Sequence, residues 1–210
     1  MKYKKKIFKK HFIFDLDGVL FNSINNMKYS WNKVSKENHL FIPFSKYKKH
    51  IGLPFYSILN KIGIKENKNK IQKKYFLFSK KNINKIKLYP EVKSVLKKLK
   101  NRGKILSIVT SKKRSNALIL LKKLEIKFDF VKTENKSLKG KPSPDLINYC
   151  IKKSNIKKKY CLYVGDMPVD LLSAKNANID FLHAKYGFDS KLKSNKSIYE
   201  FSQLLKIYIG

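Results

Sequence analysis

Acidic residues and cysteines are scarce in this chain, and each scarcity narrows the kinds of protein it can be. Its 210 residues include 14 Asp or Glu against 49 Lys or Arg, so the formal net charge is +35. The two cysteines, Cys150 and Cys161, form no C-x-x-C motif and no metal-ligand spacing. A reduced intracellular setting is therefore favoured over a disulfide scaffold.

Long apolar runs are also absent. No stretch approaches the ~18 consecutive apolar residues of a membrane span. The basic start of the chain is a poor signal peptide, because Asp15 and Asp17 interrupt the apolar residues that follow it. With an ordinary hydrophobic content of 42%, these absences predict a globular, cytoplasmic protein that makes no membrane contacts.

The large positive charge has two interpretations. A basic surface can bind nucleic acid or an anionic membrane. The alternative is biased coding, in which an AT-rich coding sequence enriches the chain in Lys, Asn and Ile. In agreement with it, lysines are spread from Lys2 to Lys206, replace most arginines, and accompany many Asn and Ile. Phosphate-reading modules depend on Arg or interleaved aromatics, and no such motif is present. We favour biased coding and predict no specific nucleic-acid partner, although the positive field would speed the arrival of a small anionic substrate.

Strand and helix patterns alternate along most of the chain. Short apolar runs predict strands at 11–14, 104–109, 128–131, 160–164 and 179–183. Helical spacing predicts helices at 90–103, 114–124, 145–153, 166–177 and around 198–208. Such alternation is typical of an α/β fold with a parallel sheet and crossover helices.

Residues 22–88 differ from the rest. Ile24, Met27, Trp31 and Val34 recur at helical spacing, and further helices are expected at 57–62 and 71–78. This stretch contains no Asp at all. We predict a helical cap at 22–88, inserted after the first strand into a core formed by 1–21 and 89–210.

Polar residues follow three of the predicted strands: Asp15 and Asp17, Thr110 and Ser111, and Asp166 with Asp170. Ligands of parallel sheets bind beyond the carboxyl ends of the strands. There Asp15 could attack a phosphorus atom and Asp17 could transfer protons, while Gly18 allows a sharp turn. The alternative is a pair of turn or capping carboxylates.

For each of the other candidate residues, a purely structural role is the alternative to a functional one. Thr110 and Ser111 could hold a phosphate at a helix start, or could simply cap that helix. Lys141 lies in a stiff Gly-Lys-Pro-Ser-Pro stretch, where a fixed cation could offset phosphate charge, but lysine is common in this chain. Asp166 and Asp170 could ligate Mg²⁺ or cap the next helix.

The order and spacing of these motifs resemble the haloacid dehalogenase superfamily. Four of its motifs occur in sequence: D-x-D-G at 15–18, a hydroxyl at Thr110, Lys141 in K-P-S-P-D, and G-D-x-x-x-D at 165–170. The resemblance implies a three-layer Rossmann-like core, Mg²⁺ as cofactor and an aspartyl-phosphate intermediate. It also implies roles for single residues: Asp15 as nucleophile, Asp17 as acid/base, Thr110 with Ser111 and Lys141 as phosphate ligands, and Asp15, Asp17, Asp166 and Asp170 around the metal.

The inserted helices resemble the small cap of the phosphoglycolate phosphatase and β-phosphoglucomutase branch. The resemblance therefore implies a phosphatase acting on a small phosphorylated metabolite, similar to phosphoglycolate or a sugar phosphate. A phosphosugar mutase is the alternative, and a non-catalytic basic nucleic-acid-binding protein is a weaker one. Substrate contacts are expected at Lys46, Lys48, Lys49 and His50, just before the Gly52 turn. The sequence leaves open whether the protein is a monomer or a homodimer.

Overall fold

The computed structural model describes residues 8–208, and its central feature is a six-stranded sheet in which every pairing is parallel. The basic start of the chain, residues 1–7, lies outside the described residues. The strand order is β5-β4-β1-β6-β7-β8. The bounds are β1 His11–Phe14, β4 Ile105–Val109, β5 Phe130–Lys132, β6 Cys161–Gly165, β7 Asp180–Ala184 and β8 Ser197–Ile198.

Strand β1 lies between β4 and β6, and all four of its residues are buried. Its side chains alternate between the two faces of the sheet, so that Phe12 and Phe14 pack on one side and Ile13 on the other. A strand covered on both faces is apolar throughout, which explains the uninterrupted apolar character of this segment.

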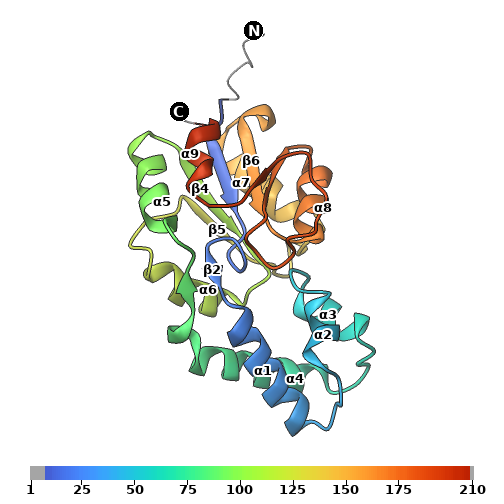
Figure 1. Ribbon diagram of the computed structural model, residues 1–210. Helices are drawn as coiled ribbons and strands as arrows, with labels where there is room; N and C mark the ends of the chain where they lie inside the picture. Colours follow the sequence, from blue (N-terminus) through green and yellow to red (C-terminus); the bar gives the residue numbers. More distant parts are fainter. Residues whose placement is uncertain (1–7, 209–210) are drawn as a thin grey trace.

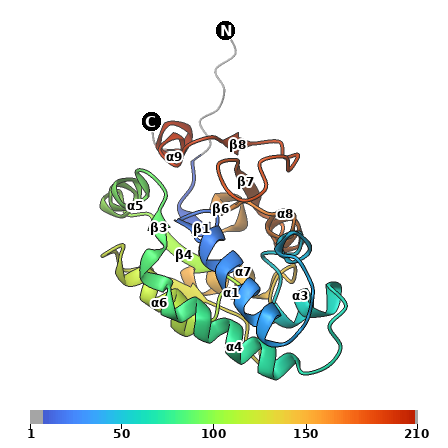
Figure 2. The ribbon, with the colours of Figure 1, turned by 60° about the horizontal axis from the view of Figure 1, so that its bottom comes forward.

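Helices cover both faces of the sheet and complete three layers (Figures 1 and 2). One face packs against α5 Val92–Asn101, α6 Arg114–Lys122 and α9 Gln203–Tyr208. The other packs against α7 Asp145–Ser154 and α8 Pro168–Ala177. This arrangement confirms the predicted α/β fold with a parallel sheet.

A group of helices lies beyond the carboxyl edge of the sheet, at the bottom of Figure 1. We call it the helical segment: α1 Ile24–Glu37, α2 Phe44–Lys48, α3 Phe55–Lys61, α4 Lys68–Lys81 and a 3-10 turn at Ile83–Lys85. It has its own apolar core around Trp31, whose ring stacks on Tyr47 at 4.7 Å between centroids. Because Met167 of the sheet domain also belongs to this core, the segment is packed onto the sheet edge.

The chain enters and leaves the helical segment through a two-stranded antiparallel ribbon, which the sequence did not predict. Strand β2, Phe21–Asn22, pairs with β3, Lys87–Leu88, in the register Phe21 to Leu88. The boundaries predicted for the insertion, 22 and 88, fall within this ribbon. The division into a core and a cap stays a prediction.

The structure corrects several predicted boundaries. Ile198 belongs to β8 and not to the last helix, which begins only at Gln203. Helix α5 begins at Val92 because Glu91 has a left-handed backbone, with φ of 59°. Apolar spacing alone does not show where the backbone enters or leaves the helical conformation. None of the helices in residues 8–208 is both long and apolar enough to cross a bilayer.

A polar group is buried in the sheet at the start of β1. The His11 ring lies 2.7 Å from the Ser107 hydroxyl and 3.0 Å from the Ser154 hydroxyl, through its two nitrogens. Burial lowers the pKa of His11 to about 4, although the charge of Asp129 partly opposes this shift. The imidazole is therefore neutral in the folded protein at pH 7.

Acidification should destabilise the fold through His11. Its folded pKa of about 4 lies below the ordinary value of 6.5, so the unfolded chain binds more protons between these two values. The stabilisation is complete above pH 6.5 and is lost as the pH falls toward 4. Between pH 7 and pH 5 we expect the free energy of unfolding to fall by about 2 kcal/mol more in the wild type than in His11→Gln. Urea denaturation measures this, and equal pH slopes in the two proteins would contradict the prediction.

Candidate active site

Asp15 lies at the carboxyl end of the central strand. Its backbone N–H still donates to the Val164 carbonyl at 3.0 Å, which continues the sheet pairing by one residue. Its carboxylate Oδ1 accepts a hydrogen bond from the Leu16 N–H at 2.7 Å, and Oδ2 lies 2.8 Å from the Lys141 ammonium. Both oxygens are thus held by the sheet edge and one buried cation.

The surroundings of Asp15 disfavour its charged form. Burial raises the pKa of Asp15 to about 7, while the Lys141 charge opposes the shift and the charges of Asp170 and Asp17 add to it. The carboxylate is 4% exposed. A divalent cation beside it would favour the ionised form that a nucleophile requires.

Lys141 is buried between two carboxylates. Its Nζ lies 2.8 Å from Asp15 Oδ2 and 2.6 Å from Asp170 Oδ1. Burial alone would lower the pKa of the Lys141 ammonium, but the two carboxylate charges raise it above the usual range. Lys141 therefore remains a fixed positive charge beside Asp15.

Asp166 and Asp170 lie on the turn that follows β6. Oxygens of Asp15, Asp166 and Asp170 all lie within 4.8 Å of one another. Asp166 Oδ2 accepts a hydrogen bond from the Phe188 N–H at 2.7 Å, whereas Oδ1 is buried without a hydrogen-bond partner. Burial, and then the Asp170 and Asp15 charges, raise the pKa of Asp166 well above its ordinary value. An unpartnered buried oxygen among crowded carboxylates fits a divalent cation.

Asp170 is fully engaged by its neighbours. Its Oδ1 accepts from Lys141 and from the Tyr163 hydroxyl at 3.0 Å. Its Oδ2 accepts from the backbone N–H groups of Asp166 and Met167 at 3.2 and 3.1 Å. In this arrangement Asp170 orients Lys141 and the Asp166 turn, and it offers no free oxygen.

Two glycines leave the space in which Asp166 lies. Gly18 has φ of +83°, and a Cβ there would collide with the Asp166 carboxylate. A Cβ at Gly187 would collide with Asp166 and with the Gly18 carbonyl. The glycine of the D-x-D-G motif therefore serves close packing as well as a turn.

Asp17 is paired with its own cation and does not belong to the cluster of Asp15, Asp166 and Asp170. The Ser23 hydroxyl donates to its Oδ1 at 2.6 Å, and the Lys112 ammonium lies 3.0 Å from each of its oxygens. Both charged side chains are nearly buried, at 9% and 7% exposed. Sequence reasoning missed Lys112, and in a chain with so many lysines no local signal distinguishes it.

The hydroxyl pair after β4 separates into two functions. Thr110 is buried, and it lines the same cavity as Asp15 and Asp17. Ser111 lines the same cavity, and its hydroxyl donates to the carbonyl of Gly52 in the helical segment at 2.6 Å. Helix α6 begins at Arg114, as predicted, with Lys113 at its N-cap position, so the prediction that Thr110 and Ser111 lie at the helix start is wrong.

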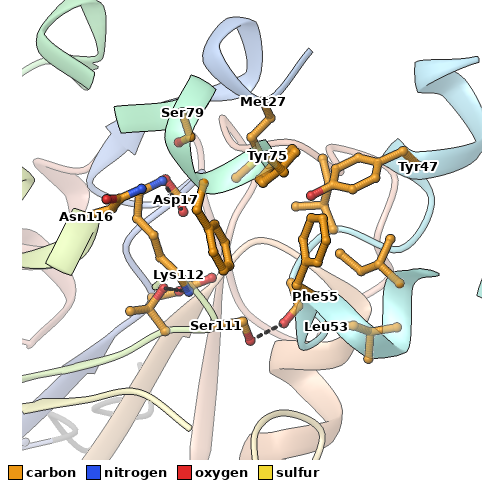
Figure 3. A pocket seen from close by; sticks show the side chains of 16 residues that line it. Asp17, Met27, Tyr47, Leu53, Phe55, Tyr75, Ser79, Ser111, Lys112 and Asn116 are labelled. Carbon is orange, nitrogen blue, oxygen red and sulfur yellow. Dashed lines mark hydrogen bonds and ion pairs between the residues drawn. The ribbon is translucent and has the colours of Figure 1, made fainter. Parts of the chain in front are cut away.

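A cavity opens above these residues and runs into the helical segment (Figure 3). Its polar end is formed by Asp15, Asp17, Thr110, Ser111, Lys112 and Asn116. Its other walls are mostly apolar: Met27, Tyr47, Ile51, Leu53, Phe55, Ile58, Tyr75 and Phe76, with Gly52 and Ser79.

The predicted substrate contacts at Lys46, Lys48, Lys49 and His50 are wrong for this conformation. None of the four lines the cavity, and the three lysines are exposed on α2 and the turn after it. Tyr47, between them, points inward. Helical geometry accounts for the difference, because residues adjacent in sequence lie on different faces.

The fold is an α/β fold with a parallel sheet. Its carboxylate and lysine cluster lies at the carboxyl ends of the strands, where α/β enzymes have their active sites. Residues 12–184 match the model of the haloacid dehalogenase-like hydrolase family. The chain belongs to this family.

Individual relatives agree with this assignment. A phosphoglycolate phosphatase from Mannheimia succiniciproducens is 30% identical over 214 aligned positions, which cover 92% of this chain and 96% of the relative. The pyrophosphatase PpaX from Oceanobacillus iheyensis is 28% identical over 173 positions, covering 80% and 79%. The crystal structure of a hydrolase from Pseudomonas syringae has the same fold, with a TM-score of 0.85 at 21% identity, over 95% of this chain and all of that one.

Removing the buried cation should destabilise the protein. Lys141→Met leaves Asp15 and Asp170 facing each other without compensation, which should lower the free energy of unfolding by about 3 kcal/mol. The exposed Lys136→Met is the matched control and should cost under about 0.5 kcal/mol. Urea denaturation at pH 7 without metal measures both, and a Lys141→Met protein as stable as the control would contradict the prediction.

Proposed function

We propose that the protein is a Mg²⁺-dependent phosphatase that hydrolyses a small phosphomonoester through an aspartyl-phosphate on Asp15. The observation that supports this most is the position of Asp15. It lies at the tip of the central strand, faces the cavity together with Asp17 and Thr110, and contacts the buried Lys141. A nucleophile, a proton-transfer group and a fixed cation are the parts that phosphoryl transfer requires.

In the first step a carboxylate oxygen of Asp15 attacks the phosphorus atom. The bond from phosphorus to the ester oxygen breaks, its electron pair stays on that oxygen, and Asp17 donates a proton to it. Lys141 and Thr110 hold the oxygens of the phosphoryl group during transfer. The products of this step are the free alcohol and the aspartyl-phosphate.

In the second step Asp17 accepts a proton from a water molecule, and the water oxygen attacks the phosphorus atom. The bond from phosphorus to the Asp15 oxygen breaks, which releases inorganic phosphate and regenerates the carboxylate. Lys112 and Ser23 keep the Asp17 carboxylate facing the cavity in both steps.

Mg²⁺ fits the acidic cluster at the sheet edge. Asp15 and Asp166 would be its carboxylate ligands, with Asp17 near the same site and Asp170 supporting the ligands from behind. The unpartnered Asp166 Oδ1 is the observation in favour. When bound, the ion neutralises negative charge on the phosphoryl oxygens and on Asp15.

We propose that the helical segment acts as a cap over this site. It supplies the apolar walls of the cavity and is joined to the sheet edge through the Ser111 to Gly52 hydrogen bond. A closed cap excludes bulk water and restricts the substrate to small molecules.

The cavity supports a phosphatase over a mutase. A mutase must hold a second phosphate, and the stretch after Gly52 offers Leu53, Pro54 and Phe55 instead of a cation. The relatives named as phosphoglycolate phosphatase and pyrophosphatase support phosphate release as the outcome.

Substitution of the two motif carboxylates should separate their roles. Asp15→Asn should abolish turnover and phosphoenzyme formation, because the amide cannot attack phosphorus. Asp17→Asn should lower kcat by about 10²–10⁴-fold while leaving Asp15 able to react with an activated acyl phosphate. Phosphate release and acid-trapped phosphoenzyme measure these effects, with the exposed Glu66→Gln as control. Full activity in Asp15→Asn would overturn the mechanism.

Mg²⁺ should stabilise the folded protein through Asp166. At about 100 times the dissociation constant, a ligand that binds only the folded state adds about 2.7 kcal/mol. We expect Mg²⁺ to raise the Tm of the wild type and of Glu66→Gln, and to have little effect on Asp166→Asn. Thermal denaturation with Mg²⁺ and with EDTA checks this, and an equal Tm increase in Asp166→Asn would exclude the proposed ligand.

A further inference from the structure

The cavity wall opposite Asp15 carries aromatic rings instead of charges. Phe55 lies 4.7 Å from Tyr75 and 5.4 Å from Phe76 between ring centroids, and Tyr47 lies 5.7 Å from Tyr75. The close-up in Figure 3 shows the rings of Tyr47, Phe55 and Tyr75 grouped on one side of the cavity, away from Asp17 and Lys112. The rings come from α2, α3 and α4, so three helices of the helical segment contribute to this wall.

Cations are almost absent from the cavity. Lys112 is the single cationic side chain among the described residues that line it. Its ammonium already lies 3.0 Å from both oxygens of Asp17. A second anionic group on a substrate, such as a carboxylate or another phosphate, would therefore enter an apolar wall without a free partner, which is unfavourable.

The tyrosines of the wall add little polarity. Burial is the main cause that raises the pKa of both Tyr47 and Tyr75. At neutral pH both rings are therefore uncharged. Asn116 and Ser79 lie at the edge of the cavity, and the Ser79 hydroxyl donates to Asn26 Oδ1 at 2.9 Å.

We propose that the leaving group of the substrate carries a flat apolar or aromatic ring, which lies against Phe55, Tyr75 and Phe76. Such a ring gains both apolar burial and favourable ring contacts in this wall. The ester oxygen then lies at the polar end, beside Asp15 and Asp17. The inference rests on the proposed phosphatase function, and it selects aryl-type or heteroaryl-type phosphomonoesters over glycolate-like and bisphosphorylated ones.

Benzyl phosphate and ethyl phosphate form the critical pair, because their alcohols have similar acidity and only one carries a ring. With Mg²⁺, kcat/KM for benzyl phosphate should exceed that for ethyl phosphate by about ten-fold or more. Phosphoglycolate should be no better than ethyl phosphate. A higher kcat/KM for phosphoglycolate than for benzyl phosphate would overturn the inference.

Variants of the cavity wall test where the ring of the substrate binds. Phe76→Ala, at a half-buried position, should lower kcat/KM for benzyl phosphate by about five-fold and change that for ethyl phosphate by less than about two-fold. The adjacent Leu77→Ala is the matched control, since Leu77 is 51% exposed and does not line the cavity. Leu53→Arg introduces a cation into the wall and should raise kcat/KM for phosphoglycolate. Equal losses for both esters in Phe76→Ala would contradict a ring contact.

Two further measurements separate this inference from the proposed function. Acetyl phosphate, which has a small leaving group without a ring, tests catalysis alone, and its failure to turn over with Mg²⁺ would overturn the phosphatase proposal. Calorimetry with benzylphosphonate and ethylphosphonate tests the cavity without turnover, and benzylphosphonate should bind about ten-fold more tightly. Equal affinities would overturn the ring inference even in an active phosphatase.

Discussion

The contact of the Lys141 ammonium with Asp15 and Asp170 is the interaction on which the site depends. It joins the end of β1 to the turn after β6, and through Asp170 it reaches the backbone N–H groups that shape that turn. Without this cation, two buried carboxylates would repel each other in a region of low dielectric. In the proposed mechanism the same charge would also hold a phosphoryl group, so that one residue would serve both folding and substrate binding.

The contact lies in the one region where this basic protein buries its carboxylates. The protein is strongly basic, yet its four buried carboxylates, Asp15, Asp17, Asp166 and Asp170, all lie at one edge of the sheet. The remaining acidic residues are partly or fully exposed. The molecule therefore combines a positive surface, which attracts anions from a distance, with an acidic pocket that suits a divalent cation.

The α/β fold and most candidate residues could be predicted, because buried strands are continuous apolar runs and parallel strands end at one edge. Asp15, Thr110 and Asp166 follow from that rule, and Lys141 follows from its motif. Lys112 could not be predicted, since its significance comes from contact with Asp17, which is distant in sequence. The cavity wall also could not be predicted. Phe55 and Tyr75 have the helical spacing of ordinary core residues, and this spacing does not distinguish a filled core from the wall of a cavity.

The short ribbon of β2 and β3 restricts how the helical segment can change. Entry and exit strands are paired, with Phe21 opposite Leu88, and Phe21 is fully buried against the sheet domain. The backbone between the two strands is connected to the carboxyl edge of the sheet through this ribbon, through side-chain packing and through hydrogen bonds such as that from Ser111 to Gly52. The paired strands hold the two ends of the helical segment side by side, and the Gly18 N–H donates to the Phe21 carbonyl at 2.9 Å. The attachment of the helical segment and the turn that follows Asp15 are therefore one continuous structure.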